Sequence, residues 1–336
     1  MSMATHPAGD KFRHEAMFYS GWAEFVSGTV PFIKQGVAAG EAVLVVESAQ
    51  KIDVLRSALD RDADGVMFAD MAEVGANPAR IIPAWQDFVR QHGQSGRDFR
   101  GIGEPIWKGR TADELVECQR HESLLNVAFG TGRPWLLLCP YDVENLPAEV
   151  IVEARRSHEF VVEGMSASHS ELYRGLEASG GRFDSPLPEP PADVRHIVFD
   201  ADSLLSLRRH AAGFAVSNGL SARRATELVT AINEVASNSI LHGGGTGSMR
   251  MWRDASGLLC EISDAGVLDK PLADRTRPGS ATRDARGLWL ANQLCDLVQV
   301  RTLPTGTSVR LHLYLDARPH LHVVEDGPSA GGRPTR

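Results

Sequence analysis

A stretch rich in glycine, serine and proline interrupts the chain near its middle. Residues 176–196 read LEASGGRFDSPLPEPPADVRH. Residues that precede proline favour extended backbone over helix, which is typical of a linker. A chain of 336 residues is long enough for two domains. We therefore predict a domain over residues 12–175, a linker over 176–194, a second domain over 195–316 and a disordered tail over 317–336 with little apolar surface to bury.

The first half alternates apolar strands with helices. Strands are predicted for four short segments, EAVLVVES (41–48), GVMFAD (65–70), DFRGIGEP (98–105) and PWLLLCPYD (134–142). Helices are predicted for residues 25–40 and 111–129. Nearly continuous apolar strands separated by helices are typical of a parallel sheet that is covered on both faces. We therefore predict an α/β sandwich.

The second half has a different order of elements. Strands are predicted at residues 196–200, 247–254, 257–266, 297–302 and 306–315, and helices at about 202–217, 221–242 and 286–296. Helices grouped on one face of a mainly antiparallel sheet form a two-layer α/β domain. The whole chain is thus predicted to belong to the α/β class.

Charge and hydropathy exclude several kinds of partner. A formal net charge of -8 gives no general attraction to phosphate backbones, so direct binding to nucleic acid is not expected. Apolar runs such as WLLLC are far shorter than the roughly 20 residues of a membrane span. We therefore expect a cytoplasmic protein without membrane contact. The four cysteines form no C-x-x-C pair, which favours buried thiols over a zinc site or disulfides.

The segment INEVASNSILHGG, residues 232–244, places three polar residues on one stripe of a helix. Glu234, Asn238 and His242 follow one another at four-residue steps beside an apolar face that includes Ile232 and Val235. Taken alone, the stripe could be the polar flank of an amphipathic helix. That interpretation is favoured for the stripe alone, and the other is that the stripe borders a cleft.

Three later stretches favour the cleft. SDAG places Asp264 at the end of a strand, where a carboxylate can accept from an exocyclic amine, and Gly266 allows close approach to the backbone. ARGLWLANQLCD places Gly287 at a helix N-terminus, where free N–H groups favour phosphate. GTSVRLHL supplies the hydroxyl of Thr307.

This ordered set of motifs resembles the GHKL (Bergerat) nucleotide-binding fold of gyrase and the histidine kinases. Its compact form, over residues 195–316, is most similar to the anti-sigma factor serine kinases. The resemblance implies that ATP and Mg²⁺ bind here, with Glu234 as the catalytic carboxylate and Asn238 holding the metal against the phosphates. It also implies that Asp264 reads the adenine amine. The remaining cofactor-binding positions that it implies are His242, Gly266, Arg286, Gly287, Leu288, Gly306 and Thr307.

The loop between the glycine motifs is basic and departs from the family pattern. Its positive residues are Lys270, Arg275, Arg277, Arg283 and Arg286. Val267 and Leu268 stand where a second glycine is usual, and the second motif has one glycine where many relatives have more. These departures weaken the prediction of catalysis more than they weaken the prediction of nucleotide binding.

The first half resembles the MEDS sensory domain, a RecA-like α/β module, over residues 12–172. GVAAGEAVLVVES lacks the G-x-x-x-x-G-K-[ST] pattern of a phosphate loop, so this domain is expected to sense or dock and not to hydrolyse. The aromatic stripe Phe18, Tyr19, Trp22 and Phe25 is interpreted as core rather than as a ligand pocket.

The histidines of the first half lack metal-ligand spacing. His14, His121 and His158 are therefore interpreted as surface or capping residues. His158-Glu159 resembles a phosphoacceptor site, but the helical residues that remain before the linker are too few for the long hairpin of a histidine kinase.

Together these resemblances imply a regulator in which a sensor controls an ATP-binding anti-sigma domain. Such a protein would sequester a sigma factor, phosphorylate a serine of a STAS-type anti-sigma antagonist and pair as a homodimer. The alternative is a nucleotide-gated binding protein that exchanges partners without phosphotransfer.

Overall fold

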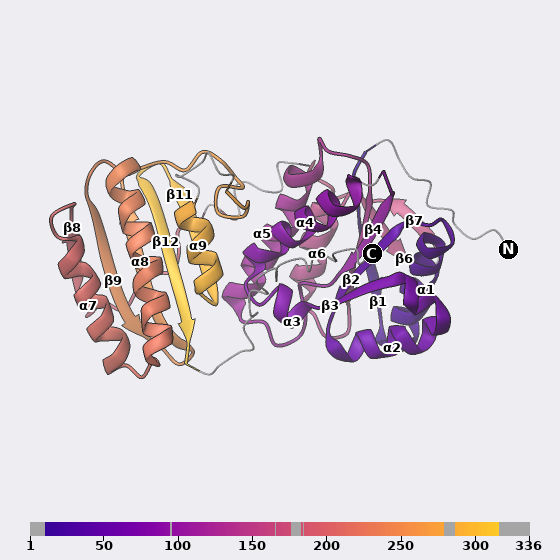
Figure 1. Ribbon diagram of the computed structural model, residues 1–336, viewed down its shortest axis with the longest axis horizontal. Helices are drawn as coiled ribbons and strands as arrows, with labels where there is room; N and C mark the ends of the chain where they lie inside the picture. Colours follow the sequence, from indigo (N-terminus) through magenta and orange to yellow (C-terminus); the bar gives the residue numbers. More distant parts are fainter. Residues whose placement is uncertain are drawn as a thin grey trace, which may run out of the picture.

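The computed structural model describes residues 11–94, 96–164, 166–175, 183, 185–278 and 286–315. It contains two lobes, each built around its own sheet, which lie side by side (Figure 1). The predicted linker is described only at 183 and 185–194, and the predicted tail lies outside the described residues.

The first lobe is a parallel sheet between two layers of helices. Its strands are β1 (Arg13–Tyr19), β2 (Ala42–Glu47), β3 (Val66–Asp70), β4 (Phe99–Gly103), β5 (Leu136–Asp142), β6 (Phe160–Glu163) and β7 (Ser166–His169). Its helices are α1 (Gly21–Ala38), α2 (Ala49–Leu59), α3 (Met71–Val74), α4 (Ile81–Gly93), α5 (Ala112–Phe129) and α6 (Ala148–Ser157), with short 3-10 helices η1 (Asp60–Gly65) and η2 (Pro78–Arg80). The strand order is β3-β2-β4-β5-β1-β6-β7, and every pairing is parallel except that of β6 with β7.

Both faces of this sheet are buried, which explains its apolar strands. Helices α4, α5 and α6 cover one face through residues such as Trp85 and Leu124. Helices α1 and α2 cover the other face through residues such as Phe25 and Leu55. Burial of a large side chain of this kind contributes about 1.5–3 kcal/mol to folding.

The second lobe has two layers. Its strands are β8 (His196–Phe199), β9 (Gly247–Arg253), β10 (Gly257–Asp264), β11 (Leu297–Leu303) and β12 (Gly306–Tyr314), and its helices are α7 (Leu204–Ser217), α8 (Ala222–His242) and α9 (Arg286–Leu294). The strands pair antiparallel in the order β11-β12-β10-β9-β8. The helices pack on one face, where Leu228, Ile232 and Leu311 belong to one buried cluster.

The two lobes meet through buried polar groups. Glu117 of α5 forms an ion pair with Arg301 of β11 at 2.7 Å and accepts a hydrogen bond from Arg275 at 2.8 Å. Glu114, one turn earlier on α5, accepts from the hydroxyl of Tyr314 at 3.2 Å. Several positive groups around Glu117 lower the pKa of this carboxyl despite its burial, so it is ionised.

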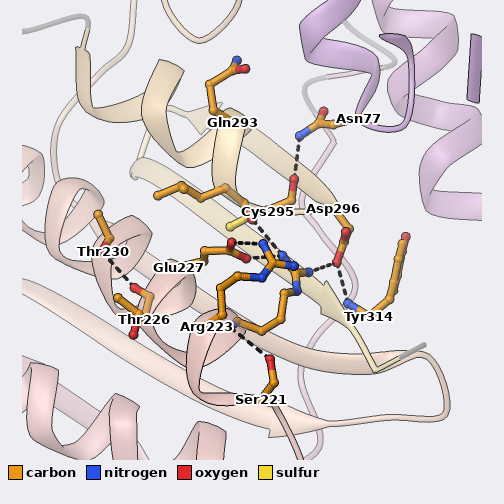
Figure 2. A network of polar contacts seen from close by, with 12 residues as sticks. Asn77, Ser221, Arg223, Thr226, Glu227, Thr230, Gln293, Cys295, Asp296 and Tyr314 are labelled. Atoms are coloured by element: carbon orange, nitrogen blue, oxygen red, sulfur yellow. Dashed lines mark hydrogen bonds and ion pairs between the residues drawn. The ribbon is translucent and has the colours of Figure 1, made fainter. Parts of the chain in front are cut away.

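Helix α9 is capped at its C-terminal end by the other lobe. The carbonyls of a helix end lack partners within the helix. Asn77 donates to the Cys295 carbonyl at 3.3 Å, a contact visible in Figure 2. Arg80 donates to the carbonyls of Asn292, Gln293 and Cys295 at 2.8, 2.9 and 3.0 Å. A buried guanidinium also complements the negative end of the helix dipole.

The predicted α/β class is confirmed, and the predicted elements agree with the observed ones to within a few residues. Strand β1 was not predicted, although it lies between β5 and β6 in the sheet. No helix in the described part of the chain is long and apolar enough to cross a membrane.

Candidate functional site

Helix α8 positions the polar stripe of the second lobe. The Ser221 side chain caps its N-terminus by accepting from the backbone N–H of Arg224, and the helix ends where Gly243 follows. Glu234 and Asn238 are partly buried and His242 is exposed, whereas Ile232 and Val235 enter the core. The stripe therefore lies at the border of the core.

A cavity of about 310 Å³ opens beside this stripe. Four segments line it: α8 with the residue after it, the end of β10 with the loop that follows (264–273), α9 and β12. Six of the predicted site residues are among the lining residues, namely Asn238, His242, Asp264, Gly266, Leu288 and Thr307. Four segments that are far apart in sequence thus converge on one crevice.

Asp264 is held at one end of the cavity by close backbone packing. Its Oδ1 accepts from the backbone N–H of Gly266 at 2.8 Å, and the hydroxyl of Thr307 donates to the Gly266 carbonyl at 2.8 Å. A Cβ at Gly243 would lie 2.4 Å from the Asp264 carboxyl carbon, so only glycine fits there. A carboxylate has about four lone-pair sites, so the fixed side chain keeps capacity to accept from a bound amine.

The start of α9 lies against Asn238. A Cβ at Gly287 would stand 2.7 Å from Asn238 Nδ2, so the missing side chain lets the helix start approach the amide. The free N–H groups of a helix start attract phosphate, and a carboxamide oxygen is a suitable Mg²⁺ ligand. The residues present therefore fit a nucleotide with its metal.

Four predicted positions are not among the lining residues: Glu234, Arg286, Gly287 and Gly306. Gly306 has a φ of +135°, and a Cβ there would lie 1.9 Å from the Asp264 carbonyl oxygen, which explains the glycine by packing. Glu234 lies one helical turn before Asn238. Its catalytic role stays a prediction.

The basic residues of the loop lie in different surroundings. Lys270 lines the cavity. Arg275 is fully buried and bonded to Glu117 of the first lobe, and Arg277 lies 3.2 Å from Asp87. Arg275 therefore holds the loop to the sensor and does not face the cavity, and Arg283 lies outside the described residues.

A second cavity, of about 320 Å³, lies at the carboxyl ends of strands in the first lobe. Lys51 contacts Glu104 closely, and its Nζ lies 3.9 Å from Glu47. Burial raises the pKa of both carboxyls, with the neighbouring acid adding to the shift at Glu47. Parallel sheets bind ligands at this edge. The strands VVES and GIGEP each end in glutamate, a pattern that could have indicated this cavity.

The aromatic stripe was only partly assigned correctly. Phe18 belongs to the core. Tyr19, Trp22 and Phe25 line an adjoining cavity of about 260 Å³, although Tyr19 and Phe25 are also buried. The interpretation as core is therefore confirmed for Phe18, Tyr19 and Phe25 and wrong for Trp22, which is 46% exposed.

The interpretation of the three histidines was also wrong. His14, His121 and His158 are all buried, because they lie on β1, on α5 and directly after α6, where these elements pack together. His158 is 0% exposed, so no phosphate donor can reach it, which agrees with the rejection of a phosphoacceptor role. All four cysteines are buried and free, as predicted.

Comparison with known families assigns each lobe. Residues 13–159 match the MEDS model, described as MEthanogen/methylotroph, DcmR Sensory domain. Residues 197–313 match the histidine kinase-like ATPase domain model. No curated protein matches the chain. The chain therefore joins an N-terminal MEDS sensory domain to a C-terminal histidine kinase-like ATPase domain.

Proposed function

We propose that this chain is a regulatory ATP-binding protein whose sensor acts directly on the nucleotide pocket. The observation that carries the proposal is the convergence of Asn238, Asp264 and Thr307 on one cavity beside the start of α9. ATP binds with its adenine amine on Asp264 and its phosphates toward Asn238. Mg²⁺, when bound, neutralises phosphate charge.

The finer proposal is phosphotransfer to a serine of a STAS-type anti-sigma antagonist by a protein that sequesters a sigma factor. Glu234 is the available carboxylate one turn before Asn238, and it orients the attacking hydroxyl. Phosphoryl transfer depends mostly on positioning and charge neutralisation, which this site can supply with few side chains. Pairing as a homodimer belongs to the same proposal.

The alternative, partner exchange without phosphotransfer, is favoured by a specific observation. Arg275 is committed to Glu117, so one basic residue of the loop is withdrawn from the phosphates. Glu234 does not line the cavity. Both observations weaken the argument for phosphotransfer, and neither affects the argument for nucleotide binding.

Contacts between the lobes give the sensor a direct route to the pocket. Asn292 of α9 donates to the backbone carbonyl of Asp274 in the loop at 2.8 Å, and its side-chain oxygen accepts from Asn77 at 3.1 Å. The sensor thus holds both α9 and the loop. A ligand that changes the sensor changes the free energy of the arrangement that binds ATP.

Titration of the full chain with labelled MgATP tests nucleotide binding. Asn238→Ala is expected to abolish Mg²⁺-dependent binding. Asn233→Ala is the matched control, because Asn233 is on the same helix but bonds to Arg208. Equal binding by wild type and Asn238→Ala would contradict the site.

Phosphotransfer is tested separately with ATP labelled on its γ-phosphate and a candidate antagonist. Wild type should label a serine, and Glu234→Gln should bind ATP without labelling it. If wild type binds ATP and labels no antagonist, the kinase proposal fails and the partner-exchange alternative stands.

A further inference from the structure

Four potential ligand side chains meet in the interior of the sensory domain, and none of them lines any of the three cavities described above. They are His14 of β1, Glu122 of α5, Cys139 of β5 and His158 after α6, and all are buried. One ligand atom from each lies within 4.8 Å of all the others. The four residues, called here the His-Glu-Cys-His cluster, come from four separate elements.

The distances within the cluster are those of a compact polyhedron. Nε2 of His14 lies 3.1 Å from Oε2 of Glu122 and 3.2 Å from Sγ of Cys139. Nε2 of His158 lies 3.2 Å from the same Glu122 oxygen. Ligands at about 2.0–2.3 Å from a tetrahedral zinc ion are separated by roughly 3.3–3.7 Å. These three pairs of atoms would therefore have to move apart by only about 0.1–0.6 Å to hold the ion.

The fold presents these groups in fixed orientations. His14 pairs with Leu137 and Ala16 pairs with Cys139 in the parallel register, so His14 and Cys139 point to the same face of the sheet. Nδ1 of His158 lies 2.8 Å from the carbonyl oxygen of Ala154. Donation from Nδ1 to a carbonyl leaves Nε2 with its lone pair toward the cluster, as in histidines that bind metals.

Hydrogen bonding within the protein does not complete the cluster. Both carboxylate oxygens of Glu122 and Nε2 of His158 are buried without a partner of good hydrogen-bond geometry. Among the described residues, the ion pairs of Glu122 are with His14 and His158, whereas the nearby Glu117 is surrounded by arginines. Burying a carboxylate whose hydrogen bonds are incomplete lowers the stability of the fold, unless a cation balances its negative charge.

We propose that the His-Glu-Cys-His cluster binds a divalent transition-metal ion, with Zn²⁺ as the best match. Imidazole, carboxylate and thiolate are all zinc ligands, and four protein ligands make a closed site. On binding, the Cys139 thiol loses its proton to solvent and a thiolate–metal bond forms. The carboxylate and thiolate together then balance the charge of the ion. A closed site without an open position holds structure and does not activate water.

Metal analysis of the purified full chain is the test. The chain is prepared without chelator or affinity-tag histidines, incubated with Zn²⁺ and dialysed, and its metal content is measured by mass spectrometry. We expect stoichiometric zinc in wild type and a fall to trace amounts in Cys139→Ser and His158→Gln. Cys118→Ser is the matched control, because Cys118 is also a buried thiol but bonds to the Pro105 carbonyl, and His169→Gln controls for an exposed histidine.

Cobalt substitution keeps the proposal testable if a ligand variant fails to fold. Wild type loaded with Co²⁺ should show a thiolate-to-cobalt charge-transfer band, which Cys118→Ser retains and Cys139→Ser loses. Wild type that takes up neither zinc nor cobalt would overturn the proposal and make the cluster a hydrogen-bonded network. Equal metal content in folded wild type, Cys139→Ser and His158→Gln would also overturn it.

Discussion

Arg80 offers a sharp test of how the two lobes are held together. Its guanidinium donates three hydrogen bonds to carbonyls at the C-terminal end of α9, at 2.8 to 3.0 Å, and the residue is buried. Arg80→Met keeps most of the apolar stem and removes every one of these donors. The carbonyls of Asn292 and Cys295 then retain Asn77 as a partner.

The expected loss of stability follows from the number and type of these bonds. A hydrogen bond from a charged donor contributes about 1.5–3 kcal/mol, but bonds that share one side chain are not additive. Removing a buried guanidinium also relieves its desolvation, which offsets part of the loss. We therefore expect Arg80→Met to lower the free energy of unfolding by about 2–4 kcal/mol. ATP affinity should fall by up to about tenfold, since α9 also borders the nucleotide pocket.

Denaturant unfolding followed by circular dichroism measures the stability, and titration with labelled MgATP measures the affinity. Arg90→Met is the control. Arg90 forms its 2.7 Å ion pair with Asp87 at an exposed position, so its loss should change stability by no more than about 0.5 kcal/mol. If Arg80→Met were as stable as Arg90→Met, the capping contacts would not hold the lobes together.

Three further changes test other parts of the structure. Gly287→Ala should weaken MgATP binding at least about tenfold in a titration, because its Cβ would stand 2.7 Å from Asn238 Nδ2; unchanged affinity would contradict the close packing. Asp264→Asn should reduce the preference for ATP over GTP in competition binding, since an amide can donate as well as accept; an unchanged preference would contradict the adenine assignment. Burial lowers the pKa of His312 to about 4. In the unfolded chain His312 is protonated below about pH 6.5, whereas in the native chain it stays neutral down to about pH 4. The free energy of unfolding therefore falls by up to about 3 kcal/mol on acidification from about pH 6.5 to 4. His312→Gln should flatten this part of the stability profile measured by denaturant unfolding.

Local patterns predicted the elements of the second lobe and six of the residues that line its cavity, because these residues belong to short motifs at element ends. The spacing of Glu234, Asn238 and His242 follows the helical repeat. Asp264 lies at the end of a strand, and Gly287 lies at the start of a helix. Each motif carries its own backbone constraint. Their convergence could therefore be inferred from order along the chain and resemblance to a known fold.

Long-range contacts carry no such local pattern. Strand β1 was not predicted because RHEAMFY includes His14 and Glu15, which interrupt its apolar run, yet both are buried. Likewise, the sequence around Arg275 indicates only a solvated charge in a loop. Its partner Glu117 is far away in sequence and belongs to the other lobe. The His-Glu-Cys-His cluster was hidden for the same reason, since His14 and His158 lie at opposite ends of the sensory domain in sequence.

Helix α5 connects the two properties of the sensory domain that the sequence did not reveal. Glu117 forms ion pairs with Arg275 and Arg301 of the ATPase lobe, and Glu122 belongs to the His-Glu-Cys-His cluster. At a rise of about 1.5 Å per residue, these two carboxylates are separated by roughly 8 Å along one helix axis. A helix transmits displacement along its axis as a rigid unit, because its hydrogen bonds connect successive turns. A displacement of α5 along its axis would therefore move Glu122 and Glu117 together, and Glu117 is paired with Arg275 of the loop that borders the cavity of the second lobe.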